Sequence, residues 1–177
     1  MKRFLSLLLA CASLIWTTEV SAQLVKPPTN NFDFEEEKPW QELNPEPPAF
    51  PKDENLREYY VSEVATNKYM IDTTSIAPGA DGVVRYVLVV KTSGGATNVS
   101  FEGLRCKDLT WKHYASGRAD GTWSKARTPE WRRVENKPVN RHHAALSRDL
   151  FCPSGDPITS ADEGRNALRL GKHPNAN

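Results

Sequence analysis

The sequence lacks the short motifs that mark common catalytic sites. It contains no Gly-x-Ser-x-Gly turn, no Ser-x-x-Lys pair and no phosphate-binding Gly-x-x-x-x-Gly-Lys-Ser/Thr loop. It also lacks the His-Glu-x-x-His and Cys-x-x-Cys patterns that are typical of zinc sites. We therefore expect a non-catalytic protein with neither a metal nor a cofactor. A small cell-envelope hydrolase is the alternative, because catalytic triads are defined by geometry and need no sequence motif.

The N-terminal apolar stretch is too short to span a bilayer. It covers residues 4–16, which is 13 residues, whereas a membrane-spanning helix needs about 20. The basic pair Lys2-Arg3 precedes it, and small residues stand before Gln23. This arrangement is typical of a secretory signal peptide over residues 1–22. We expect a periplasmic protein with no transmembrane segment in the mature chain. Association with the outer membrane and secretion are the alternatives.

A second interpretation of the N-terminus concerns Cys11. The sequence Leu8-Leu9-Ala10-Cys11 resembles the processing box of lipoproteins, in which the cysteine becomes acylated. The apolar run before Cys11 is short for a signal peptide, and apolar sequence continues to Trp16. Cleavage before Gln23 is therefore the expected event, and a lipid-anchored structural factor is the alternative.

The sequence also lacks a net charge. The whole chain has 23 basic and 22 acidic residues, and removal of the signal segment with Lys2, Arg3 and Glu19 leaves 21 of each sign. This balance argues against nucleic acid as a partner. The charges are unevenly spread, with acidic residues in excess over 26–54 and basic residues in excess over 105–148. The acidic segment could fold back on the basic one or remain a solvated tail.

Cysteine is scarce, and two cysteines remain after signal cleavage. In an exported chain Cys106 and Cys152 have a single possible pairing, a disulfide. Two isolated cysteines do not form a zinc site, so that alternative is weak.

Proline divides the chain into an extended leader and a globular domain. Residues 23–55 contain seven prolines and few aliphatic residues, which predicts a leader without regular structure that is dispensable for folding. Four aromatic residues in the leader suggest spots that dock on a surface: Phe32, Phe34, Trp40 and Phe50. We place the globular domain at residues 56–155 and a short helix with a flexible tail at 156–177.

The pattern after Leu56 predicts an antiparallel meander of five or six strands. Residues 83–92 are apolar at nearly every position, which is typical of a central strand that is buried on both faces. Turn residues separate the other expected strands, which are 60–64, 69–71, 97–106, 109–116 and 122–127.

Helix is expected only near the C-terminus. Asn140 can cap a helix that Pro153 ends, and Thr159 or Ser160 can cap a second helix over 161–170 that ends at Gly171. A sheet followed by one or two helices belongs to the α+β class. In this arrangement the Cys106–Cys152 disulfide joins helix to sheet.

Tryptophans and basic residues alternate in the second half of the chain. Such a surface can bind a sugar face or an anionic polymer, and in an envelope this indicates an unknown envelope protein or a cell-wall component. The alternative is that the tryptophans fill the core while the cations line the solvated face. The candidate ligand residues are Trp111, Lys112, Trp123, Arg127, Trp131, Arg132 and Arg133.

The histidines give little support to a catalytic or metal site. His142 and His143 point about 100° apart on a helix, so both cannot easily face one metal ion. We expect both to pack the helix or face solvent, His113 to lie on a polar strand face, and His173 to lie in a frayed tail.

Several short motifs between Tyr69 and Cys152 are similar to those of a known family. They are Lys-Tyr-Met-Ile-Asp (68–72), Val-Arg-Tyr-Val-Leu-Val-Val (84–90), Glu-Gly-Leu-Arg-Cys (102–106), Trp-x-x-x-Ala-x-Gly-x-Ala-Asp-Gly-Thr-Trp-Ser (111–124) and Leu-x-x-Asp-Leu-Phe-Cys-Pro (146–153). The chain resembles the cryptic neisserial protein-like family of exported proteobacterial proteins. The resemblance implies a Gram-negative envelope location. It brings no established activity and no catalytic residue.

Overall fold

Eight antiparallel strands form the centre of the structure, a computed structural model that describes residues 39–176. Six strands pair in the order β1-β2-β4-β5-β6-β7, while β3 pairs with β4 and β8 pairs with β6. The α+β class and the meander are confirmed. The strands are β1 (Leu56–Glu58), β2 (Lys68–Asp72), β3 (Ala77–Pro78), β4 (Val83–Lys91), β5 (Thr97–Arg105), β6 (Thr110–Gly117), β7 (Trp123–Lys125) and β8 (Trp131–Arg133).

The expected strand count was too low because the sequences of three short strands show no apolar pattern. β1, β3 and β8 have two or three residues each, too few to show an alternation. The expected strand at 60–64 is instead a turn, in which the amide of Ala65 donates to the carbonyl of Ser62 at 3.1 Å. Tyr60 and Val64 are 66% and 75% exposed, so the apolar residues of this segment share no buried face.

The central strand β4 is buried on both of its faces. Val84, Tyr86 and Leu88 point into one apolar cluster. Val87 and Val89 point into a second cluster on the opposite face. This division explains why the segment is apolar at nearly every position, and it requires a cover on each side of the sheet.

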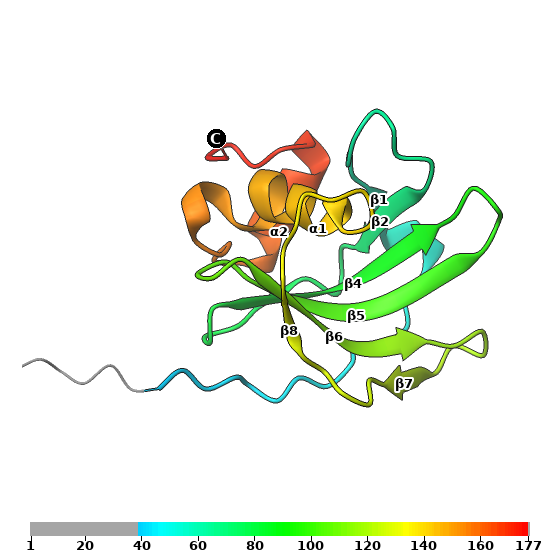
Figure 1. The fold of residues 1–177 in the computed structure, drawn as a ribbon, viewed down its shortest axis with the longest axis horizontal. Helices are drawn as coiled ribbons and strands as arrows, with labels where there is room; N and C mark the ends of the chain where they lie inside the picture. The colour runs from blue at the N-terminus through cyan, green and yellow to red at the C-terminus, as the bar shows by residue number, and fades with distance from the viewer. Residues whose placement is uncertain (1–38, 177) are drawn as a thin grey trace, which may run out of the picture. The chain divides into compact units, whose positions relative to one another are not determined.

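Helices cover the first face of the sheet (Figure 1). Helix α1 (Arg141–Ala145) continues as the π-helical segment η2 (Leu146–Phe151), and α2 (Ala161–Leu170) follows. Ser160 caps α2 by accepting the amide of Glu163, whereas the side chain of Asn140 makes no capping bond. The remaining turns are the 3₁₀ helices η1 (Asp53–Asn55) and η3 (Pro153–Gly155). None of the helices within 39–176 is long and apolar enough to cross a membrane.

The opposite face of the sheet is covered by part of the N-terminal leader. We call residues Trp40–Phe50 the strap; the segment has no helix or strand and runs along the side of the sheet away from the helices (Figure 1). The compact unit that contains the sheet begins at Pro39. The predicted signal peptide, Cys11, Phe32 and Phe34 lie outside the described residues.

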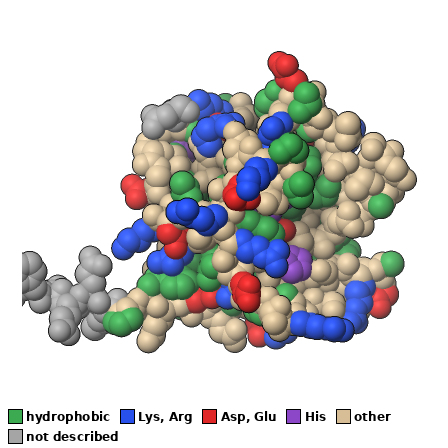
Figure 2. Space-filling view, in the orientation of Figure 1, with side chains coloured by type: hydrophobic (Ala, Val, Ile, Leu, Met, Phe, Trp, Pro, Cys, Tyr) green, Lys and Arg blue, Asp and Glu red, His purple; other side chains and the backbone are tan. Residues whose placement is uncertain are grey.

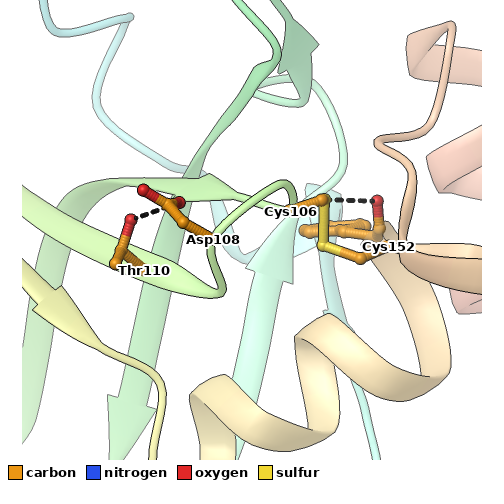
Figure 3. Close-up of a disulfide and its surroundings, with 5 residues drawn as sticks. Cys106, Asp108, Thr110 and Cys152 are labelled. Atoms are coloured by element: carbon orange, nitrogen blue, oxygen red, sulfur yellow. Dashed lines mark hydrogen bonds between the residues drawn. A yellow bond between two sulfur atoms is a disulfide. The ribbon is translucent and has the colours of Figure 1, made fainter.

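A disulfide joins the end of the sheet to the end of the helical layer. Cys106 follows β5 and Cys152 follows η2, and their sulfur atoms are bonded (Figure 3). Both cysteines are buried, with 2% and 5% of their surface exposed. The disulfide therefore fixes the helical layer to the sheet, as the sequence predicted.

The C-terminal residues that the structure describes are held more firmly than a frayed tail. His173 is 5% exposed and its ring nitrogen Nε2 lies 2.9 Å from Oε1 of Glu163. The amide of His173 donates to the carbonyl of Asp149 at 2.7 Å. The expected position of His173 in a frayed tail is wrong, because α2 turns the chain back onto η2.

We predict that Cys106→Ser and Cys152→Ser each lower the free energy of unfolding by about 2–5 kcal/mol, because the disulfide closes a loop with a sequence separation of 46 residues. The double variant should lose the same amount as either single variant. Urea denaturation measures the losses, and the wild type under reducing conditions is the control. Additive losses in the double variant would contradict the pairing.

Candidate functional site

The structure places the seven predicted ligand residues on both faces of the sheet. Trp111 and Arg132 contact each other, with the guanidinium carbon 5.8 Å from the ring centroid, and Trp111 packs against the helix-side core. Lys112, Trp131 and Trp123 contact the strap on the other face. The seven residues therefore do not form one surface.

On the helix side, Trp111 forms the wall of an open hollow of about 380 Å³. We call it the Trp111 hollow. It lies between β6, β8 and the loop that connects β7 to β8, and its lining residues are Trp111, His113, Ala126, Arg127, Thr128, Glu130 and Arg132. Figure 2 shows basic side chains on the face that it displays, with acidic side chains among them and a histidine beside one of the basic groups.

The cations of the Trp111 hollow are available for a ligand. Arg127, Arg132 and Glu130 are all exposed. Within residues 39–176, none of the three takes part in an ion pair. The hollow thus offers two guanidinium groups and one carboxylate around an aromatic wall. Such a set favours an anionic group that has an apolar or planar neighbour.

A buried carboxylate lies behind this hollow. Glu102 is 4% exposed, and its Oε2 lies 2.8 Å from Nε2 of His143. Its other oxygen, Oε1, accepts a hydrogen bond from the hydroxyl of Ser100 at 2.7 Å. Burial by itself would raise the pKa of Glu102, but His143 and Ser100 outweigh burial and lower that pKa. The carboxylate therefore stays ionised inside the protein.

This buried group has the residue types of an acid–base pair but no access to a substrate. His143 is 1% exposed, and the ring of Trp111 stacks on it with the centroids 3.8 Å apart. The hydroxyl of Tyr86 also donates to Glu102, at 3.3 Å. A general base must reach the proton that it removes, and Glu102 and His143 have little contact with solvent. The group is suited to holding α1 against the sheet.

His142 is also a packing residue. Its ring stacks on Tyr69 with the centroids 4.9 Å apart and an angle of 14° between the planes. Burial, and then the neighbouring His143, lowers the pKa of His142 to about 4. Both histidines thus take the helix-packing role that the sequence favoured. Within residues 39–176, no group of three or more His, Cys, Asp or Glu side chains is arranged to hold a metal ion.

Sequence reasoning missed the residues that organise each face. Glu102 gave no signal, since one carboxylate in a strand resembles a solvated residue. Nothing in the sequence distinguished Glu42 from the other acidic residues of the leader. Nothing distinguished Tyr114 from the other aromatic residues of β6. The acidic excess of the leader opposite a basic domain was the usable signal, and the structure brings Glu42 to Lys112 and Glu46 to Lys125.

We predict that acid destabilises the protein through His142. The unfolded chain binds a proton at this histidine below a pKa of about 6.5, whereas the folded protein does so only near 4. The free energy of unfolding should therefore fall by up to about 3 kcal/mol as the pH drops through that window. Glu102, whose folded pKa is lowered from 4.5, adds a loss at still lower pH.

The variant His142→Phe keeps a ring for stacking on Tyr69 but cannot titrate, so its stability should vary less between pH 6.5 and 4. Urea unfolding midpoints over this range measure the effect. His113→Gln, in which a half-buried histidine that contacts Ser116 is replaced, is the control. Equal slopes for His142→Phe and the wild type would contradict the role of His142.

Comparison with known proteins agrees with the motifs in the sequence. Residues 35–169 match the CNP1-like family. The chain is 27% identical over 103 residues to Cryptic neisserial protein 1 of Neisseria gonorrhoeae (strain ATCC 700825 / FA 1090), and the matched part is 51% of this chain and 50% of that protein. The chain thus spans about half the length of this curated relative. No solved structure matches it. Because the family match covers most of its length, the chain belongs to the CNP1-like family.

Proposed function

We propose that this protein is an exported, non-catalytic binding domain of the cell envelope. In this proposal the Trp111 hollow takes a phosphate or carboxylate group of an envelope component. The observation that carries the proposal is the pair of exposed guanidinium groups, Arg127 and Arg132, which share one hollow and take part in no ion pair within residues 39–176.

Two further features support the proposal. The signal-like residues 1–22 and the Cys106–Cys152 disulfide fit an oxidising compartment outside the cytoplasm. The burial of Glu102 and His143 supports a non-catalytic role, since the most enzyme-like side chains of the described region serve the fold. The hollow is open to solvent, whereas Glu102 and His143 are buried.

Arginine suits the proposed ligand for a physical reason. A planar guanidinium binds phosphate or carboxylate oxygens through two parallel hydrogen bonds, and it is always charged. Arg132 also lies over Trp111, which limits the positions that its side chain can take. Glu130 opposes an anion, so it should weaken the binding that Arg127 and Arg132 provide.

We predict that the protein binds vesicles of phosphatidylglycerol or isolated peptidoglycan, and that binding weakens as salt rises. Arg127→Gln with Arg132→Gln should weaken binding at least about tenfold, and Glu130→Gln should strengthen it. Cosedimentation measures each affinity, with phosphatidylcholine vesicles as the neutral comparison.

Arg118→Gln with Arg169→Gln is the matched control, because it removes the same charge outside the hollow. An equal loss in this control would show that total charge, and not the hollow, determines binding. Absence of binding to both materials would contradict the proposed ligand class.

The N-terminus tests the export proposal separately. We predict that the protein isolated from its native host begins at Gln23 or its cyclised form, because small residues precede that position. Intact-mass measurement identifies the terminus directly. A mass that corresponds to an acylated Cys11 would instead establish the lipid-anchored alternative.

A further inference from the structure

We propose that the face of the sheet opposite the helices is a peptide-binding site for an acidic, proline-rich segment of a partner protein. In the isolated chain the strap occupies this site. The site is independent of the Trp111 hollow, which lies on the other face. The contacts between the sheet and the strap indicate the class of ligand.

The first part of the site is a receptor for one carboxylate. Glu42 accepts hydrogen bonds from Nζ of Lys112 at 2.7 Å, from the hydroxyl of Tyr114 at 2.7 Å and from Nε1 of Trp131 at 3.3 Å. The Lys112 and Glu42 side chains are 13% and 20% exposed, so this pair is partly desolvated. Three donors from two strands that converge on two oxygens select for an acidic residue at this position.

The ring contacts of Trp40 define one end of the site. The guanidinium carbon of Arg105 lies 3.8 Å from the centroid of the Trp40 ring, and Trp131 meets the same ring edge-on at 5.9 Å. The indole nitrogen of Trp40 donates to the carbonyl of Asp81 at 2.8 Å. The site thus contacts both the ring and the ring nitrogen of an aromatic residue two positions before the acidic residue.

The domain also forms hydrogen bonds with the backbone of the strap. The amide of Leu43 donates to Oδ2 of Asp81 at 2.9 Å, and the carbonyl of Leu43 accepts from Nη2 of Arg85 at 3.1 Å. Farther along, Nε1 of Trp123 donates to the carbonyl of Pro48 at 2.9 Å. Because these bonds reach main-chain atoms, any extended peptide of similar length can satisfy them.

Prolines and a final aromatic residue complete the recognised pattern. Between Glu42 and Phe50 the strap contains Pro45, Pro47 and Pro48, which lower the entropy that an extended peptide loses on binding. The ring of Phe50 packs on Trp123 with the centroids 5.4 Å apart. A Cβ atom at Gly117 would come within 2.8 Å of the Phe50 ring, so the glycine leaves room for it.

Every contact of the strap with the sheet is made by side chains or by isolated backbone groups, without a strand ladder. The strap is tethered, so its effective concentration at the site is on the order of millimolar. A free peptide with the same pattern must compete with it. Weakening the strap while the receptor stays intact should therefore open the site.

The test uses the mature full chain and a synthetic peptide of residues 39–50. Titration of the peptide is followed through the indole N–H signals in nuclear magnetic resonance spectra. In the variant Trp40→Ala with Glu42→Gln, the signals of Trp123 and Trp131 should shift on titration, while that of Trp111 on the other face should not. The wild type should need at least about tenfold more peptide for the same shift.

Two controls identify the carboxylate receptor. The peptide with Glu42→Gln should bind about tenfold more weakly than the unchanged peptide. Added to the strap variant, Lys112→Met should weaken binding by a similar factor, whereas Lys91→Met, which removes the exposed contact with Asp53, should not. If the two-site strap variant is unfolded, the competition titration with folded wild type provides the same comparison.

Several results would overturn the inference. Failure of the peptide to shift the Trp123 and Trp131 signals in the folded strap variant, or equal shifts with the Glu42→Gln peptide, would show that the strap is a structural element alone. The wild type could also form a concentration-dependent dimer that the peptide dissociates. That result would show that two copies of the chain exchange straps, and that no partner protein is the ligand.

Discussion

The double-sided burial of β4 is the constraint on which the rest of the structure depends. A strand that is apolar on both faces cannot lie at a water-facing surface, so each side of the sheet needs its own cover. The helical layer supplies one cover and is fixed by the Cys106–Cys152 disulfide. The strap supplies the other, although it has no regular structure. The two covers differ in their chemistry, since the first is largely apolar and the second combines polar contacts with the ring contacts of Trp40 and Phe50.

The same asymmetry separates the charges of the protein. On the helix side, Glu102 is ionised and almost completely buried, and its partners hold α1 in place. On the strap side, the carboxylate of Glu42 lies nearer to solvent and meets a cation from β6. An enclosed ion pair is strongly damaged when one partner is removed, whereas a partly exposed one can be exchanged at a modest cost. The carboxylates of Glu102 and Glu42 are thus buried to different degrees on opposite faces of the sheet.

Much of the fold could be predicted because the apolar pattern reports burial directly. The unbroken apolar run of β4, the turns at Gly82, Gly95 and Gly121, and the Ser160 cap follow from local chemistry. The short strand β8 and the strap could not be predicted, because long-range contacts hold them and their own sequences show no period. The candidate site was wrong for a different reason. Trp111 and Lys112 are neighbours in sequence, and the pleat of β6 places such neighbours on opposite faces.

The strap also constrains the order in which the fold is assembled. Its contacts join Glu42 to Lys112, Tyr114 and Trp131, which lie 70, 72 and 89 residues later in the chain. A growing chain presents its N-terminal residues first, yet these residues have no surface to bind until β6 and β8 have formed. The first part of the described chain to emerge can therefore dock only after Trp131 has been made. Until then, Tyr114 and Trp123, which pack against the apolar cluster around Phe101 and Val87, lack their strap partners.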